Sequence, residues 1–288
     1  MRPATPDQVF TGARTLPLYA LFLVSGLLVF LGGMTFAPVF AAHVSTALQI
    51  ATTGLFLAAA LLLRRNERLR QFWTLAFAFF IAASAILAMS VLGHGAMQVF
   101  AVSVDNPPGI ATAKFIESCI AIATILVLLK LSRQKLSSAY WQAGRLKQGL
   151  TLGVVLFAGF VVLGILRLAG QDYSLARLLP LIPWILIFVF ANGAMEELLF
   201  RGIFLKRCEP YFGTNGSNVL TAIVFSVAHM QVTYTADVPV FLVIVFFLGL
   251  GLGHVMQRTD SLIAPVLFHA GADIPFMVDI FANQGANI

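Results

Sequence analysis

The chain has 288 residues, of which 59% are hydrophobic and only 10% are charged, and its formal net charge is +6. Soluble domains carry about 25% charged residues, so this composition excludes an ordinary soluble protein and indicates an integral membrane protein. Basic residues on cytoplasmic loops orient membrane proteins, so the positive charge does not indicate nucleic-acid binding, and no nucleic-acid partner is expected.

Nine apolar segments follow one another along the chain, most of them near the ~20 residues that a bilayer requires. The predicted spans are residues 16–31, 44–63, 72–92, 110–131, 150–166, 179–206, 217–230, 238–256 and 261–280. The first segment could instead be a cleaved signal peptide, and the short seventh could be re-entrant. We therefore predict an all-α, polytopic transmembrane helical bundle of about eight to nine spans.

The charged residues between these spans predict an orientation. If every segment crosses, one side holds the basic residues of 64–70, 133–147, 206–207 and 258, and the other holds Asp105, Asp172 and Asp237, with Arg167 and Arg177 as exceptions. Since basic loops remain in the cytoplasm, we expect a cytoplasmic N-terminus. The expected location is a bacterial plasma (inner) membrane, with lipid as the surrounding partner.

Residues 194–202 place two adjacent acids and an arginine inside an apolar run. An ionisable side chain at bilayer depth costs about 2.5–3.5 kcal/mol on insertion scales, so it normally faces a bundle interior or a wet cavity. Glu197 and Arg201 are four residues apart, which is the spacing of a helical ion pair. Glu196 points about 100° away from Glu197 and has no local partner, so the two acids should serve different purposes.

Two further patterns add ionisable groups to later spans. The first is F-S-V-A-H, which ends at His229, and the second is H-A-G-A-D, from His269 to Asp273. An acid one turn after His269 can fix the orientation of the imidazole or place a second polar group beside it. At about 1.5 Å per residue, all these groups lie roughly 12–18 Å below the basic loops. A buried site of this kind could activate water and hydrolyse an amide.

The ordered patterns E-E-x-x-x-R, F-x-x-x-H and H-x-x-x-D resemble the motifs of the CPBP family of intramembrane proteases, also called the Abi family. That family includes CAAX-type prenyl endopeptidases and bacteriocin-processing enzymes. The resemblance covers residues 179–275, about the last third of the chain. It implies that Glu196 activates the attacking water, that His229 assists, and that His269 and Asp273 line an oxyanion site or a metal.

Within this resemblance, Glu197 and Arg201 match the second glutamate and the arginine of the first motif, and we interpret them as structural support. The metal question stays open at this point. Glu196, His229 and His269 could supply three ligands with an open fourth position, as in catalytic zinc sites. Equally, Glu196 could activate water without a metal, and the chain lacks the H-E-x-x-H pattern.

The predicted function is that of an intramembrane endopeptidase of the CAAX prenyl protease type, acting on a membrane-associated or lipid-anchored protein or peptide. The alternatives are a catalytically silent membrane scaffold or immunity factor, and an ion-coupled transporter. The absence of an internal repeat weakens the transporter reading. We expect N-terminal transmembrane helices without a recognisable motif in residues 1–175 and a catalytic domain in residues 176–288. The catalytic cavity is expected to open toward the cytoplasm.

Overall fold

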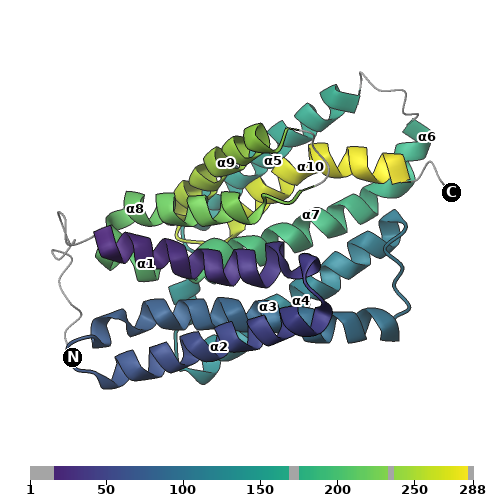
Figure 1. The fold of residues 1–288 in the computed structure, drawn as a ribbon. Helices are drawn as coiled ribbons and strands as arrows, with labels where there is room; N and C mark the ends of the chain where they lie inside the picture. Colours follow the sequence, from purple (N-terminus) through teal and green to yellow (C-terminus); the bar gives the residue numbers. More distant parts are fainter. Residues whose placement is uncertain (1–15, 169–174, 233–236, 285–288) are drawn as a thin grey trace.

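The computed structural model describes residues 16–168, 175–232 and 237–284 as a bundle of long helices (Figure 1). Within these ranges every regular element is helical, which confirms the predicted all-α transmembrane bundle. Asp172 and residues 1–15, on which part of the predicted orientation depends, lie outside the described residues.

The main elements are α1 (Leu16–Leu27), η1 (Leu28–Thr35), α2 (Ala42–Arg65), α3 (Trp73–Val99), α4 (Pro107–Leu131), α5 (Leu146–Leu168), α7 (Ile182–Glu196), η6 (Glu197–Gly202), α8 (Leu205–Ala228), α9 (Val238–Thr259) and α10 (Ile263–Gln284). Short helical turns connect them: η2 (Ala37–Val39), η3 (Arg70–Phe72), η4 (Leu136–Ala139), α6 (Leu175–Leu178) and η5 (Leu179–Leu181). Two elements, η1 and η6, are wider π-helical turns that extend the helices before them.

Eight described segments are long and apolar enough to cross a bilayer: Leu16–Thr35, Ala42–Arg65, Arg70–Val99, Pro107–Leu131, Leu146–Leu168, Ala176–Gly202, Val238–Thr259 and Ile263–Asn283. A ninth long helix, α8, is more polar and changes direction at Gly213, which has a positive φ of 68°. Its apolar part after the kink matches the predicted seventh span. In Figure 1, α1 begins at one end of the bundle and α10 finishes at the other.

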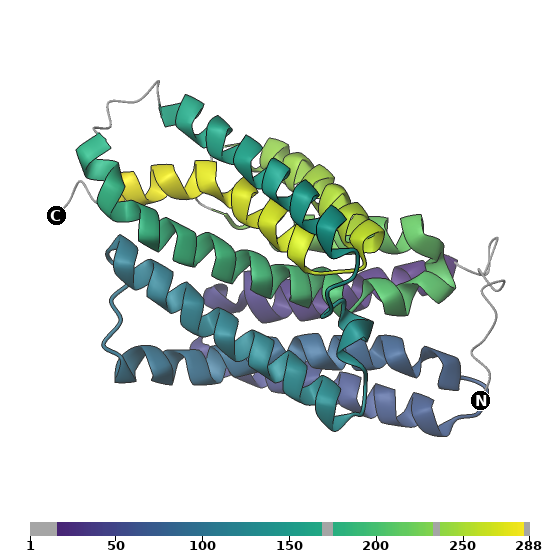
Figure 2. The same cartoon turned by 180° about the vertical axis from the view of Figure 1, so that it is seen from behind.

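The bundle has two halves that meet along their length. Helices α2, α3 and α4 pack in sequence in one half, and α5, α7 and α9 surround α10 in the other. Contacts of α4 with α7, and of α1 with α8, join the halves, and Figure 2 shows α5 lying along α10 from behind. Tilted and edge-on phenylalanine rings pack between the halves, including those of Phe22, Phe79, Phe204 and Phe212.

Three connections that carry basic residues are tied together at one end of the bundle. Lys206 Nζ lies 2.5 Å from Asp260 Oδ1, and Gln142 Nε2 donates to Asp260 O over 2.9 Å. Arg207 Nη2 donates to Ser138 Oγ over 2.9 Å. This end, called the basic end below, is formed by the connections around residues 138–142, 206–207 and 260. Its cytoplasmic orientation stays a prediction.

Candidate active site

Helices α7 and α10 approach each other closely at a glycine just before the paired glutamates. A Cβ atom added at Gly193 would lie 3.3 Å from both Ala270 N and Val266 O. Only a residue without a side chain leaves this backbone-to-backbone contact unstrained. The close approach brings the carboxylates that follow on α7 within reach of His269 on α10.

The turn after Gly193 widens into the π-helical element η6, all of whose residues are buried. Arg201 Nη1 donates to Glu197 Oε1 over 2.6 Å, and both side chains are fully buried. Arg201 Nε also donates to Gly249 O over 3.3 Å, and its guanidinium lies 4.2 Å from the centre of the Phe225 ring. The buried cation is thus held by a carboxylate, a carbonyl and an aromatic face, which together offset its desolvation.

His269 is oriented by Glu197 rather than by the acid on its own helix. Its Nδ1 donates to Glu197 Oε1 over 2.8 Å. Its Nε2 lies 3.6 Å from Glu196 Oε2 and 3.6 Å from Asp273 Oδ1. The expectation that Asp273 could fix the imidazole is therefore replaced by a different arrangement. One glutamate anchors the ring, and its free nitrogen faces the other glutamate and the aspartate.

His229 caps the end of α8 and points its free nitrogen at the same glutamate. Its Nδ1 donates to Phe225 O over 2.7 Å, and its Nε2 lies 3.8 Å from Glu196 Oε2. The Phe225 ring packs edge-on against both imidazoles, with centroids 4.6 Å from His229 and 5.8 Å from His269. The phenylalanine of the F-x-x-x-H pattern thus supplies a carbonyl for one histidine and a wall for both.

Asn192 is a polar residue of this site that the sequence analysis did not single out. It lies on α7 one turn before Glu196, and its Nδ2 donates to Asp273 Oδ2 over 3.0 Å. An amide carries no charge, so Asn192 does not belong to the pattern of ionisable groups in these spans. Its spacing of four residues from Glu196 was the available signal, since residues so spaced share a helix face.

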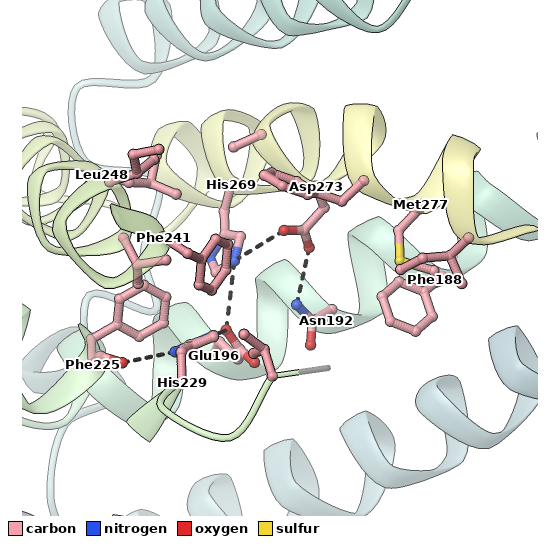
Figure 3. Close-up of a pocket in the computed structure, with 16 residues that line it drawn as sticks. Phe188, Asn192, Glu196, Phe225, His229, Phe241, Leu248, His269, Asp273 and Met277 are labelled. Carbon is pink, nitrogen blue, oxygen red and sulfur yellow. Dashed lines mark hydrogen bonds and ion pairs between the residues drawn. The ribbon is translucent and has the colours of Figure 1, made fainter. Parts of the chain in front are cut away.

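These side chains surround one end of a cavity of about 260 Å³ (Figure 3). Its polar lining is Asn192, Glu196, His229, His269 and Asp273, and its apolar lining is Phe188, Phe225, Val232, Phe241, Ile244, Val245, Leu248, Ala272, Phe276, Met277 and Ile280. Buried charges in a largely apolar cavity interact more strongly than they would in water. The cavity therefore has a polar end formed by these five side chains, and the rest of its lining is apolar.

From Glu196, the lining of the cavity extends away from the basic end. From Glu196 the lining runs back along α7 to Phe188, about 12 Å at 1.5 Å per residue, and along α10 to Ile280. Toward the basic end the space is filled by the buried residues of η6, where Phe200 stacks on Phe30 and meets Phe225 edge-on. The cytoplasmic opening expected from the sequence stays a prediction.

The predicted metal ligands converge, but their positions do not make a metal site. Glu196 Oε2 faces the Nε2 atoms of His229 and His269, which are ligand types that zinc accepts. Across the described residues, however, no group of three or more histidine, cysteine, aspartate or glutamate side chains is arranged to hold a metal ion. The side chains as placed are not arranged as this three-ligand site, and metal binding stays the open question that the sequence left.

Comparison with known proteins finds a matching family. Residues 178–275 match the family model of the Rce1-like type II CAAX prenyl endopeptidases. This segment is similar to that family and is called the Rce1-like segment below. The match confirms the resemblance seen in the three motifs and implies a peptidase. It spans about one third of the chain and includes every polar residue of the cavity. No curated protein and no solved structure matches the chain.

The Rce1-like segment lies mostly in the half of the bundle that contains the cavity. It begins just before η5 and reaches Pro275 on α10, so it supplies α7, η6, α8, α9 and much of α10. Helix α5, which precedes the segment, packs along α10. The proposed division of the chain at residues 175 and 176 stays a prediction.

Proposed function

We propose that the chain is an intramembrane endopeptidase that hydrolyses a peptide bond of a membrane-associated or lipid-anchored protein or peptide, with water activated by Glu196. The observation that carries the proposal is that one carboxylate oxygen, Glu196 Oε2, faces two imidazole nitrogens at 3.6 and 3.8 Å. This oxygen is buried and has no hydrogen-bond partner among the described residues. A carboxylate in this position is suited to accept a proton from water.

The geometry supports a specific first step. A water molecule donates one hydrogen bond to Glu196 and a second to His229 Nε2, which can accept because the Nδ1 proton is held by Phe225 O. Glu196 then takes the proton while the water oxygen bonds to the carbonyl carbon of the substrate. The electron pair of the carbonyl double bond moves to its oxygen, which becomes an oxyanion.

The second step breaks the peptide bond. His269 in its protonated form donates from Nε2 to the oxyanion, while its Nδ1 remains bonded to Glu197. As the oxyanion re-forms the carbonyl, the carbon–nitrogen bond breaks and Glu196 returns its proton to the leaving nitrogen. The products are a carboxylic acid and an amine, and Glu196 is ready for another cycle. No step in this scheme passes through a metal ion.

The shape of the cavity supports an apolar substrate. The reactive groups occupy one end, and the remaining lining consists of phenylalanine, methionine and aliphatic side chains. A peptide with an aliphatic or lipid-modified residue beside the bond to be cleaved would bury that group in this space, and such burial contributes roughly 25 cal/mol for each Å². The matching family is one of prenyl endopeptidases, which supports a prenylated substrate for this chain.

The proposal is tested by incubating purified protein with a lipopeptide library and comparing wild type with Glu196→Gln. This substitution keeps the shape of the side chain but removes the base, so kcat should fall by about 10²–10⁴-fold. Glu117→Gln is a matched control, because Glu117 is a half-exposed glutamate of α4 paired with Lys114 outside the cavity. Its kcat should stay near wild type.

Two results would contradict the proposal. Cleavage by Glu196→Gln at the wild-type rate would remove Glu196 as the base. A wild-type chain that yields no peptide product would favour the scaffold alternative, and ion movement driven by a gradient, without a product, would favour the transporter.

A further inference from the structure

Asn192 belongs to the polar end of the cavity but to none of the three motifs. It is 9% exposed, it lines the cavity, and it lies one helical turn from Glu196. Figure 3 shows it between α7 and α10, pointing toward Asp273. Among the described residues, Asp273 is its one side-chain hydrogen-bond partner.

A hydrogen-bond donor is needed beside Asp273 if a negative oxygen develops there during the reaction. An ionised carboxylate only accepts hydrogen bonds, so Asp273 in its ionised form cannot stabilise a negative oxygen that develops beside it. An asparagine amide has two N–H groups. In Asn192 one of them is used by Asp273 Oδ2 at 3.0 Å, which fixes the amide plane at the cavity wall. The second N–H remains available to a molecule in the cavity.

We infer that Asn192 is a further catalytic residue, whose second N–H donates to the carbonyl oxygen of the bond being cleaved and stabilises the oxyanion together with His269. This inference rests on the proposed function and adds a residue to it. Asp273 then acts as a positioning residue, because it holds the amide of Asn192 and faces His269 Nε2 at 3.6 Å. Two neutral or cationic donors, one from α7 and one from α10, would converge on the same oxygen.

The test compares Asn192→Asp and Asn192→Ala with wild type. The aspartate variant keeps the shape and loses both donors, and the alanine variant loses them without adding a charge beside Asp273. Removal of one oxyanion donor lowers kcat by about 10²–10³-fold in well-studied proteases, and we expect that range here with KM changed only a few-fold. A peptide phosphinate, whose tetrahedral anion resembles the intermediate, should lose affinity by a similar factor. The affinity of the product peptide should not change.

A matched control separates catalysis from folding. Asn218 is also a buried asparagine, and its amide donates to Leu250 O over 2.9 Å, but it does not line the cavity. Asn218→Ala should lower thermal stability while keeping the wild-type kcat and phosphinate affinity. Substitution at Asn192 should therefore lower kcat and phosphinate affinity, and substitution at Asn218 should lower only thermal stability.

The outcomes discriminate between this inference and the function on which it rests. If wild type cleaves peptide and both Asn192 variants keep its kcat and phosphinate affinity, the inference is wrong and the proposed function stands. If the Asn192 variants lose thermal stability as Asn218→Ala does but keep phosphinate affinity, Asn192 is structural and the inference is again wrong. If wild type cleaves no peptide, the proposed function fails and this inference fails with it.

Discussion

At the scale of single residues, the two adjacent glutamates have separate environments. Glu197 is fully buried, and its Oε1 accepts from both Arg201 and His269. Glu196 lines the cavity and faces two imidazoles without a direct hydrogen bond. Removing one partner of a buried ion pair costs roughly 3–5 kcal/mol. Glu197 therefore both stabilises η6, through its ion pair with Arg201, and orients the imidazole of His269.

The sequence predicted part of this arrangement. Helical spacing separated Glu196 from Glu197 and paired Glu197 with Arg201, because those relations lie within a few residues of one chain segment. The bond between Glu197 and His269 joins residues 72 positions apart. Periodicity carries no information about such a contact, so the residue that orients the imidazole could not be identified before the helices were placed.

A prediction about metal content belongs at this scale. With the ligand atoms as placed, we expect purified, active protein to contain well under one zinc or other divalent metal per chain and to keep its activity in the presence of a chelator. Elemental analysis of the same sample whose cleavage rate is measured checks this. One metal per chain, with activity lost on chelation and restored by the metal, would instead show that Glu196, His229 and His269 rearrange into a metal site.

At the scale of elements, the site depends on how closely α7 meets α10. Gly193 allows that approach. The π-helical turn η6, which begins four residues later at Glu197, holds the side chains of Glu197 and Arg201 in the interior. Such turns are frequent at functional sites. The helices themselves could be predicted from apolar length, but η6 could not, since one extra residue in a turn leaves no mark on composition. The polar first part of α8 was missed for the same kind of reason, as its basic residues resemble a loop.

Substitution of Gly193 by alanine tests this dependence. The added methyl group would lie 3.3 Å from backbone atoms of α10, so α7 must move or strain, at a cost of about 1–3 kcal/mol in stability. A displacement near 1 Å can lower kcat by about 10²-fold, and we expect a loss of that order. Both are measurable by thermal unfolding in detergent and by peptide cleavage.

Gly159 on α5 provides the control for this substitution. No atom lies within 4 Å of a Cβ built there. Gly159→Ala should therefore leave kcat unchanged and raise stability by about 0.4–1 kcal/mol, because alanine has fewer accessible conformations in the unfolded chain. Equal behaviour of the two alanine variants would show that the close contact at Gly193 does not position the site.

At the scale of the whole molecule, the cavity lining extends from Glu196 toward the end of the bundle opposite the basic end. Counting residues from the basic loops placed the reactive groups at similar depths, and the structure brings them together. Counting residues could not predict whether packed side chains or a cavity lie on each side of these groups. The packing beside these groups includes the contacts of Phe200 with Phe30 and Phe225, which come from three separate segments of the chain.

This geometry predicts that water and substrate reach Glu196 from the half of the membrane opposite the basic end. Part of the cavity wall already faces outward there, since Ile244 on α9 is 54% exposed. With the orientation predicted from the basic loops, that half is the outer one. A substrate would then present its cleavage site from the outer leaflet, with its apolar part between helices.

Thiol labelling in sealed membranes tests the direction of access. The background is Cys119→Ala, because Cys119 is exposed whereas the other cysteine, Cys208, is buried. Met277→Cys should react with a polar, impermeant thiol reagent supplied from one side only. Glu67→Cys, on an exposed loop beside the basic end, should react from the other side and so reports the orientation independently. Met277→Cys and Glu67→Cys reacting from the same side would show that the cavity opens at the basic end, because the aromatic packing there would then have to part and admit the reagent.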